Sequence, residues 1–200
     1  EIYSSYFANN GYSGDQKNWS DPWADGITVT YCGGGYIHNN DIVDNTDIGL
    51  VIGRGFDCWA LWNAVEQVDQ YVFVGFQVGA FQVPNIEHYN ALYQYNQIDS
   101  AGDKMAAGIF IGDRPWRADH TIYGPFEVVD NKVNGAVVGM SIDGIDEGRI
   151  LNNGLYNAQG SAGLFGCTYS GLFTAADYGS ATIQGGSVTR HYHAGSGCFT

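Results

Sequence analysis

Positive charge is scarce in this sequence. Only eight of the 200 residues are Lys or Arg, against 21 Asp and Glu, so the formal net charge is −13. Nucleic-acid binding requires cationic side chains that neutralise phosphates, and this balance argues against it. It also argues against unaided binding of strongly anionic glycans, although Ca²⁺ could bridge two acidic surfaces. We expect no cofactor, with Ca²⁺ the one ion left open.

Long apolar runs are also missing. No stretch of about 18 uninterrupted apolar residues exists, so no membrane span is expected. The first seven residues lack the basic start and the apolar core of a signal peptide. We therefore expect the chain to be mature or cut from a larger one, with residues 1–200 forming a single domain.

Paired cysteines of the CxxC type are absent, which argues against a zinc ribbon or a redox dithiol. An even number of cysteines suits disulfides, and small buried thiols are the alternative. Sequence alone does not give a pairing. The four cysteines are Cys32, Cys58, Cys167 and Cys198.

The residues that are abundant favour short strands and tight turns. There are 29 glycines, and Phe, Trp and Tyr together make up 14% of the chain. This composition is typical of a β-rich protein and not of long helices.

An element of the form apolar-x-x-Asn-x-apolar recurs along the chain. Its asparagines are Asn40, Asn63, Asn96, Asn131 and Asn153, with degenerate copies at Ser5 and Gly186. The Asn positions are 23, 33, 35 and 22 residues apart, which matches one β-helix turn with loops of variable length. We expect Asn and Gly to share this position because both tolerate a left-handed backbone. Stacked Asn side chains could also hydrogen-bond to one another.

A second element, x-Gly-apolar-x-apolar, follows most of these turns. Copies occur at residues 25–29, 48–52, 107–111, 138–142 and 162–165. Alternation within each strand predicts one continuous inward row. Its members would be Ile27, Leu50, Ile109, Met140 and Leu164. The two elements together predict about seven rungs.

The repeated elements resemble the right-handed parallel β-helices of the pectate-lyase-like superfamily. That superfamily includes polysaccharide lyases, polygalacturonase-like glycoside hydrolases and tailspikes. The resemblance covers nearly the whole chain and implies an all-β, right-handed parallel β-helix from an extracellular protein that handles carbohydrate. It is specific for architecture and loose for activity, because some members only bind.

Insertions are expected at residues 8–23, 76–91, 112–125 and 165–180, all on one face, between the second strand and the next Asn turn. They hold side chains that suit sugar binding, since aromatic faces stack on pyranose rings. These include Trp19, Trp23, His88, Tyr89, Trp116, Arg117, His120 and Tyr169. The alternative is that the rings pack the bases of the loops. Trp59 and Trp62 flank a repeat position and are expected to pack.

Two aspartates on neighbouring rungs are the catalytic candidates. Asp25-Gly26-Ile27, followed one rung later by Asp47, resembles the paired acidic rungs of polygalacturonase-like enzymes. Adjacent parallel strands lie about 4.8 Å apart, so the two carboxylates can act as an acid and a base on one glycosidic bond. The sequence departs from the family because Ile48 stands opposite Asp25, where a second acid is usual. The alternative is that both aspartates cap backbone N–H groups in turns.

A loop rich in charge is the second candidate. Asp113, Arg114, Trp116, Arg117 and His120 lie within eight residues and form a plausible binding rim. The alternative is an Arg–Asp network that only pins the insertion. Near this face the basic groups of note are Arg54, Arg114 and Arg117, so a hydrolase or lectin for neutral glycans fits better than a lyase.

Two function hypotheses follow. The first is a glycoside hydrolase that cleaves an extracellular polysaccharide with Asp25 and Asp47. The second is a non-catalytic module, such as a tailspike shaft, adhesin or surface filament, that binds or presents glycans. A homo-oligomer is left open, since β-helix shafts often trimerise but no heptad is present. We expect Asp25, Asp47, Trp23 and the loop with Trp116 and Arg117 to border one groove.

Overall fold

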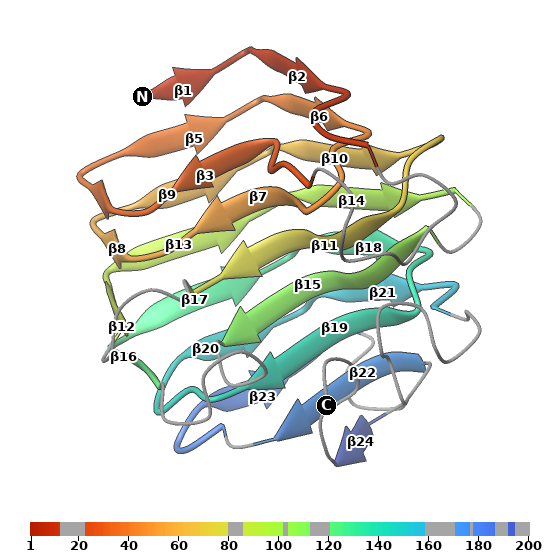
Figure 1. Cartoon of the computed structure of the whole chain (residues 1–200). Helices are drawn as coiled ribbons and strands as arrows, with labels where there is room; N and C mark the ends of the chain where they lie inside the picture. Colours follow the sequence, from red (N-terminus) through yellow and green to blue (C-terminus); the bar gives the residue numbers. More distant parts are fainter. Residues whose placement is uncertain are drawn as a thin grey trace.

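In the computed structural model the chain coils into a parallel β-solenoid of about seven rungs (Figure 1). The structure describes residues 1–12, 23–79, 86–101, 104–112, 121–158, 171–176, 178–186 and, for the backbone alone, 192–194. All regular secondary structure in these ranges is β-strand. The same ranges hold no helix with the length and apolar character needed to cross a bilayer. The expected all-β solenoid is confirmed.

Four parallel sheets run along the solenoid. Sheet A consists of β1 (Ile2–Tyr3), β5 (Tyr36–His38), β9 (Trp59–Leu61), β13 (Ala91–Gln94), β17 (Phe126–Val129), β20 (Arg149–Leu151) and β23 (Thr182–Gln184). Sheet B consists of β2 (Tyr6–Ala8), β6 (Asp41–Val43), β10 (Ala64–Gln67), β14 (Gln97–Ser100), β18 (Lys132–Asn134) and β21 (Gly154–Tyr156).

The other two sheets complete each rung. Sheet C consists of β3 (Ile27–Val29), β7 (Ile48–Ile52), β11 (Val72–Val78), β15 (Met105–Gly112), β19 (Val138–Asp143), β22 (Gly171–Ala176) and β24 (Tyr192–Ala194). The short sheet D consists of β4 (Cys32–Gly33), β8 (Gly55–Phe56), β12 (Ile86–Tyr89) and β16 (Ile122–Tyr123). The chain passes from A through B and C to D, and the coil is right-handed (Figure 1).

The inward row of sheet C is an apolar ladder in register. Its members are Ile27, Leu50, Phe76, Ile109, Met140 and Phe173. The predicted row is thus confirmed except at two rungs. Phe76 of β11 was not expected, and Phe173, not Leu164, lies beside Met140. Residues 162–165 themselves lie outside the described ranges. Residues 163–165 and 171–173 have the same Gly-apolar pattern, so only the strand pairing shows which of them continues sheet C.

Gly49 of the second element and Gly75, which pairs in register with it on β11, lie where sheets B and C approach one another. A Cβ atom on Gly49 would lie 2.5 Å from Val65 Cγ1, and one on Gly75 would lie 2.5 Å from Ile98 Cγ2. Both partners are buried residues of sheet B. Glycine therefore recurs here because no side chain fits between the sheets.

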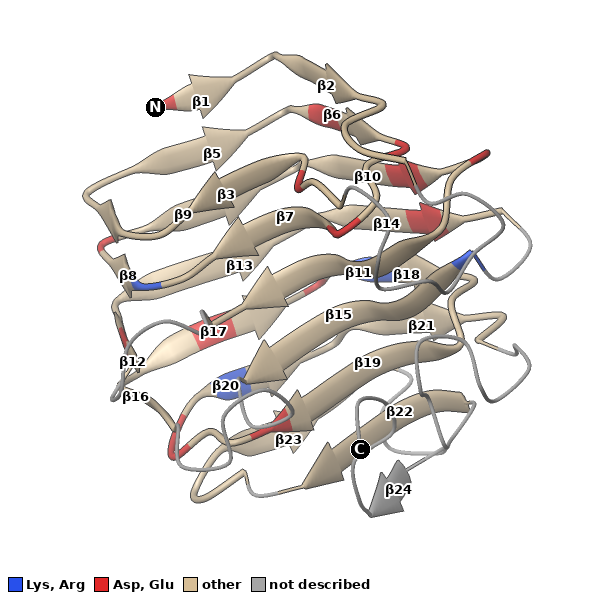
Figure 2. Ribbon diagram, viewed as in Figure 1, with Lys and Arg blue, Asp and Glu red and all other residues tan. Residues whose placement is uncertain are grey.

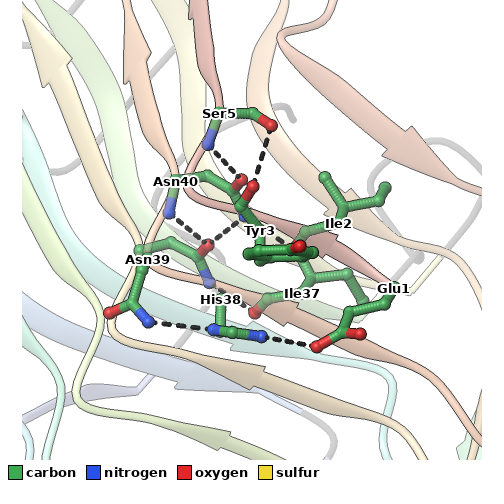
Figure 3. A network of polar contacts seen from close by, with 9 residues as sticks. Glu1, Ile2, Tyr3, Ser5, Ile37, His38, Asn39 and Asn40 are labelled. Carbon is green, nitrogen blue, oxygen red and sulfur yellow. Dashed lines mark hydrogen bonds and ion pairs between the residues drawn. The ribbon is translucent and has the colours of Figure 1, made fainter.

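The recurrent asparagines form a continuous hydrogen-bonded ladder at the turn between sheets A and B. Each Nδ2 donates to the Oδ1 of the next asparagine at 2.9 Å, from Asn40 through Asn63, Asn96 and Asn131 to Asn153. At the first rung the Ser5 N–H donates to Asn40 Oδ1 at 3.1 Å, as Figure 3 shows. All five asparagines are buried. The predicted alignment of the five at one turn is confirmed.

The left-handed residue of this turn is the one before each asparagine, which corrects the sequence-based expectation. Positive φ angles occur at Ser4, Asn39, Trp62, Tyr95, Asp130, Asn152 and Gly185. The ladder asparagines themselves have negative φ angles. Asn is required there because its carboxamide both donates and accepts, so each buried group has a partner on the neighbouring rung.

A disulfide joins neighbouring rungs. Cys32 of β4 and Cys58, just before β9, are bonded with their Cα atoms 5.6 Å apart. The expectation that cysteines form disulfides is met for this pair. Cys167 and Cys198 lie outside the described residues.

Some long connections come before a sheet C strand in the chain, and others come after one. Those after β2 and β21 precede sheet C, whereas those after β11 and β15 follow it. The expectation that all insertions leave at one turn is therefore wrong. Extra length is accommodated at either turn that flanks sheet C, because neither carries the continuous Asn ladder.

Replacing Asn96 by Ala should lower the free energy of unfolding by about 2 to 4 kcal/mol. Asn96 Oδ1 accepts from the N–H and the Nδ2 of Asn63, and its Nδ2 donates to Ala60 O, so truncation leaves buried groups unpaired. Urea unfolding followed by circular dichroism measures the loss. The control is Asn134→Ala on the exposed face of sheet B, which should cost under about 1 kcal/mol. Equal costs for the two variants would contradict a stabilising role for the ladder.

Gly75→Ala should destabilise the solenoid by about 1 to 3 kcal/mol or more. The added methyl would meet Ile98 Cγ2 and also Gly108 O at 2.8 Å, so either the sheets separate or a strand shifts. The matched control is Gly34→Asn, where φ is +64° and no atom lies within 4 Å of the added Cβ. Asn tolerates this conformation, so the control should retain nearly full stability. Thermal unfolding of both variants gives the comparison.

Candidate functional site

The two predicted catalytic aspartates come together at the start of sheet C. Ile27 pairs with Leu50, so Asp25 stands opposite Ile48 and Asp47 opposite Ala24, as the glycine alignment predicts. Figure 2 shows the acidic positions just before β3 and β7. Both side chains are half-buried. Each belongs to a different rung, so the pair depends on the register of sheet C.

Asp25 is held by hydrogen bonds. Thr28 Oγ1 donates to its carboxylate, and the Ile48 N–H of the next rung donates to Oδ1 at 3.2 Å. Burial raises the pKa of Asp25, and these two hydrogen bonds act in the opposite direction because they stabilise the ionised form. The contacts tie Asp25 to its own rung and to the next.

Asp47 lies in a different environment. Burial and, to a lesser extent, the negative charge of neighbouring Asp25 together raise the pKa of Asp47 to about 6. Two carboxyl groups close together that differ in hydrogen bonding divide into a proton donor and a proton acceptor. In this pair Asp47 is suited to hold the proton and Asp25 to remain ionised.

Trp23 lies at the same end of the sheet. It is half-buried and packs against an apolar cluster on the outer side of sheet C. The cluster includes Ile48, Val51, Phe73, Val74, Ala107, Phe110 and Val138. In register with Asp25, the outer position continues down the solenoid as the apolar residues Ile48, Val74, Ala107 and Val138.

Gln77 is a polar residue of this face that sequence reasoning missed. It lies in register between Val51 and Phe110 and is fully buried. Within the described part of the chain, neither its Oε1 nor its Nε2 has a hydrogen-bond partner. Because Gln77 has no exposed surface, it does not add a ligand contact to the candidate site. The signal in the sequence was a lone Gln inside the apolar run of residues 72–78.

Arg54 does not join the acid pair. It follows the far end of β7, roughly 20 Å along the strand from Asp47. Its Nη2 lies 3.1 Å from Glu87 Oε2, and its guanidinium lies 5.9 Å from the centre of the Tyr31 ring. Arg54 therefore belongs to the surface of sheet D.

Several predicted binding residues lie outside the described residues: Trp19, Asp113, Arg114, Trp116, Arg117, His120 and Tyr169. The groove expected to join Trp116 and Arg117 to the aspartates stays a prediction for this reason.

Two aromatic assignments need correction. His88, expected among the sugar-binding residues, is fully buried, and its Nδ1 lies 2.6 Å from Tyr93 Oη. Burial lowers the pKa of His88 to about 3, so the imidazole is a neutral core group. Trp62, expected to pack, is 53% exposed. Its place directly before ladder residue Asn63 is the signal that it points outward.

No family model, no curated protein and no solved structure matches this chain. The functional argument therefore rests on its fold and its side chains. Among the described residues, no group of three or more His, Cys, Asp or Glu side chains is placed to hold a metal ion.

Asp47→Asn should stabilise the protein at pH 7 and not at pH 4. The folded state holds the Asp47 proton more tightly than the unfolded state, so Asp47 costs stability as the pH rises from about 4 through about 6. Removing the charge should restore about 1 to 2 kcal/mol at pH 7, allowing for partial exposure. Urea unfolding at the two pH values tests this, with exposed Asp41→Asn as the control. A variant less stable than wild type at pH 7 would contradict the assignment.

Proposed function

We propose that this chain hydrolyses an extracellular polysaccharide at the start of sheet C. Asp47 acts as the general acid and Asp25 as the general base. The observation that carries the proposal is the pairing of two half-buried carboxyl groups on adjacent rungs in different hydrogen-bonding environments. Perturbed carboxyl groups of this kind cluster at catalytic sites.

The reaction uses the two groups in complementary roles. Asp47 protonates the glycosidic oxygen as the C–O bond breaks. Asp25 takes a proton from a water molecule, whose oxygen bonds to the anomeric carbon. Proton exchange with solvent then returns both carboxyl groups to their starting states. The Thr28 and Ile48 hydrogen bonds hold Asp25 ionised and oriented.

Several features support a neutral extracellular glycan as the substrate. The half-buried Trp23 packs against the apolar cluster of sheet C that contains Ile48, the residue next to Asp47 in sequence. The net charge of −13 disfavours a polyanionic substrate, so a neutral glycan fits best. The Cys32–Cys58 disulfide supports an oxidising, extracellular location. The resemblance to polygalacturonase-like hydrolases supports the same class through architecture.

Hydrolysis should depend on both carboxyl groups. In a reducing-sugar assay over neutral and acidic polysaccharides, Asp47→Asn and Asp25→Asn should each lower turnover by about 10² or more. Activity of the wild type should fall as the pH rises through about 6, because Asp47 then loses the proton it donates. Asp41→Asn is the matched acidic control and should keep full activity. Unchanged turnover in both site variants would eliminate the pair.

A non-catalytic glycan-binding module is the second candidate. The hydrogen bonds from Thr28 and Ile48 to Asp25 are also those of a turn-capping carboxylate. Wild-type protein that binds glycan and cleaves none of the panel would establish this function instead.

A further inference from the structure

The outer face of sheet A contains a groove that runs along the solenoid. It has a volume of about 530 Å³. Its floor takes one outward residue from each of five successive rungs: Trp59, Leu92, Glu127, Arg149 and Thr182. Since these residues occupy one column in register, the groove is straight and parallel to the solenoid axis.

A second hollow continues the groove toward the N-terminus. It has a volume of about 320 Å³ and is lined by Glu1, Tyr36, His38, Leu61 and Trp62. Tyr36 of the second hollow pairs in register with Trp59 of the groove, and their rings lie 4.4 Å apart, so the linings of the two hollows are in contact at this aromatic pair. Figure 3 shows two of its lining residues, Glu1 and His38, in contact with each other, and Tyr3 stacked on His38. The joined track, from Glu1 on the first rung to Thr182 on the seventh, spans seven rungs, about 29 Å.

Trp62 and Tyr95 lie beside this track, and both have a left-handed backbone conformation that is unfavourable for large side chains. Trp62 and Tyr95 have φ angles of 54° and 58°, and their rings stack at 5.7 Å. Most other rungs place Ser, Asn, Asp or Gly at this turn position. A left-handed backbone costs a bulky residue about 1 kcal/mol or more, and both rings stay about half exposed. Backbone strain without compensating burial is typical of binding residues.

The charge of the groove selects its ligand. Its charged side chains are Glu127, Glu147 and Arg149, and Arg149 is already paired with Glu127. The remaining charge is negative, which repels uronates and phosphates. The ion pair and the hydroxyl groups of Ser180 and Thr182 can bind sugar hydroxyls, while the rings present flat apolar faces.

We propose that the outer face of sheet A binds a neutral, extended oligosaccharide along the solenoid axis, at a site separate from the acid pair of sheet C. Neighbouring rungs are about 4.8 Å apart, close to the length of one pyranose unit in an extended chain. Successive sugars therefore meet successive rungs. Trp59 and Trp62 are the principal stacking platforms, and the Glu127–Arg149 pair orients the chain through its hydroxyl groups. The site does not rest on hydrolysis at Asp25 and Asp47.

Calorimetric titration with neutral hexasaccharides of glucose, xylose and mannose tests this site. Trp59→Ala and Trp62→Ala should each weaken binding at least tenfold, because each removes a stacking surface. The matched control is Tyr156→Ala, since Tyr156 is 51% exposed against 53% for Trp62 but lies on sheet B. Asp25→Asn/Asp47→Asn protein should bind as tightly as wild type, so loss of hydrolysis and loss of this site are told apart.

Several results would overturn the proposal. These are the absence of binding to every neutral hexasaccharide, binding of oligouronates alone, or binding of an extended peptide in place of glycan. Wild-type affinity in both tryptophan variants would also overturn it. Trp62→Ala is the decisive variant, because Trp62 is exposed and its removal leaves the core intact.

Discussion

The constraint on which this fold depends is that each rung must lie in register over the next. The Asn ladder enforces it, because a buried carboxamide needs a donor on one side and an acceptor on the other. A rung displaced by one residue would leave Asn63 or Asn96 without its partners. Gly49 and Gly75 of sheet C add a second requirement. Each must lie against a sheet B side chain, Val65 or Ile98, because any larger residue there would keep sheets B and C apart.

Register is also what creates linear surfaces on a solenoid. Equivalent residues of successive rungs form columns, so a change of residue type along a column divides a face into zones. On sheet C the outer column is acidic at Asp25 and apolar from Ile48 onward. On sheet A it is aromatic at Tyr36 and Trp59 and charged at Glu127 and Arg149. Each candidate site lies at a boundary of this kind.

The repeated features of the fold could be predicted from the sequence, whereas the features that depart from the repeat could not. The Asn positions, the glycine alignment and the opposition of Asp25 to Ile48 follow from local patterns, and the structure has them as expected. The residue beside Met140 in the inward row is Phe173 and not Leu164. Strand pairing decides this, and the sequence does not reveal it because both segments have a Gly-apolar pattern. The exposure of Trp62 and the burial of His88 depend on which turn is left-handed and which side faces the core. The groove on sheet A was missed because its residues are scattered from Trp59 to Thr182 and only the columns bring them together.

The disulfide between neighbouring rungs gives the solenoid an uneven mechanical response. A force applied to the two ends of the chain would peel rungs away one at a time, since each contacts chiefly its neighbours. Cys32 and Cys58 are 26 residues apart in the sequence, and pulling on the chain ends cannot extend the segment between them while the disulfide is intact. About 90 Å of contour length is thereby withheld. The second rung, which carries Tyr36 and Asp47, would keep its length under tension until the bond is reduced.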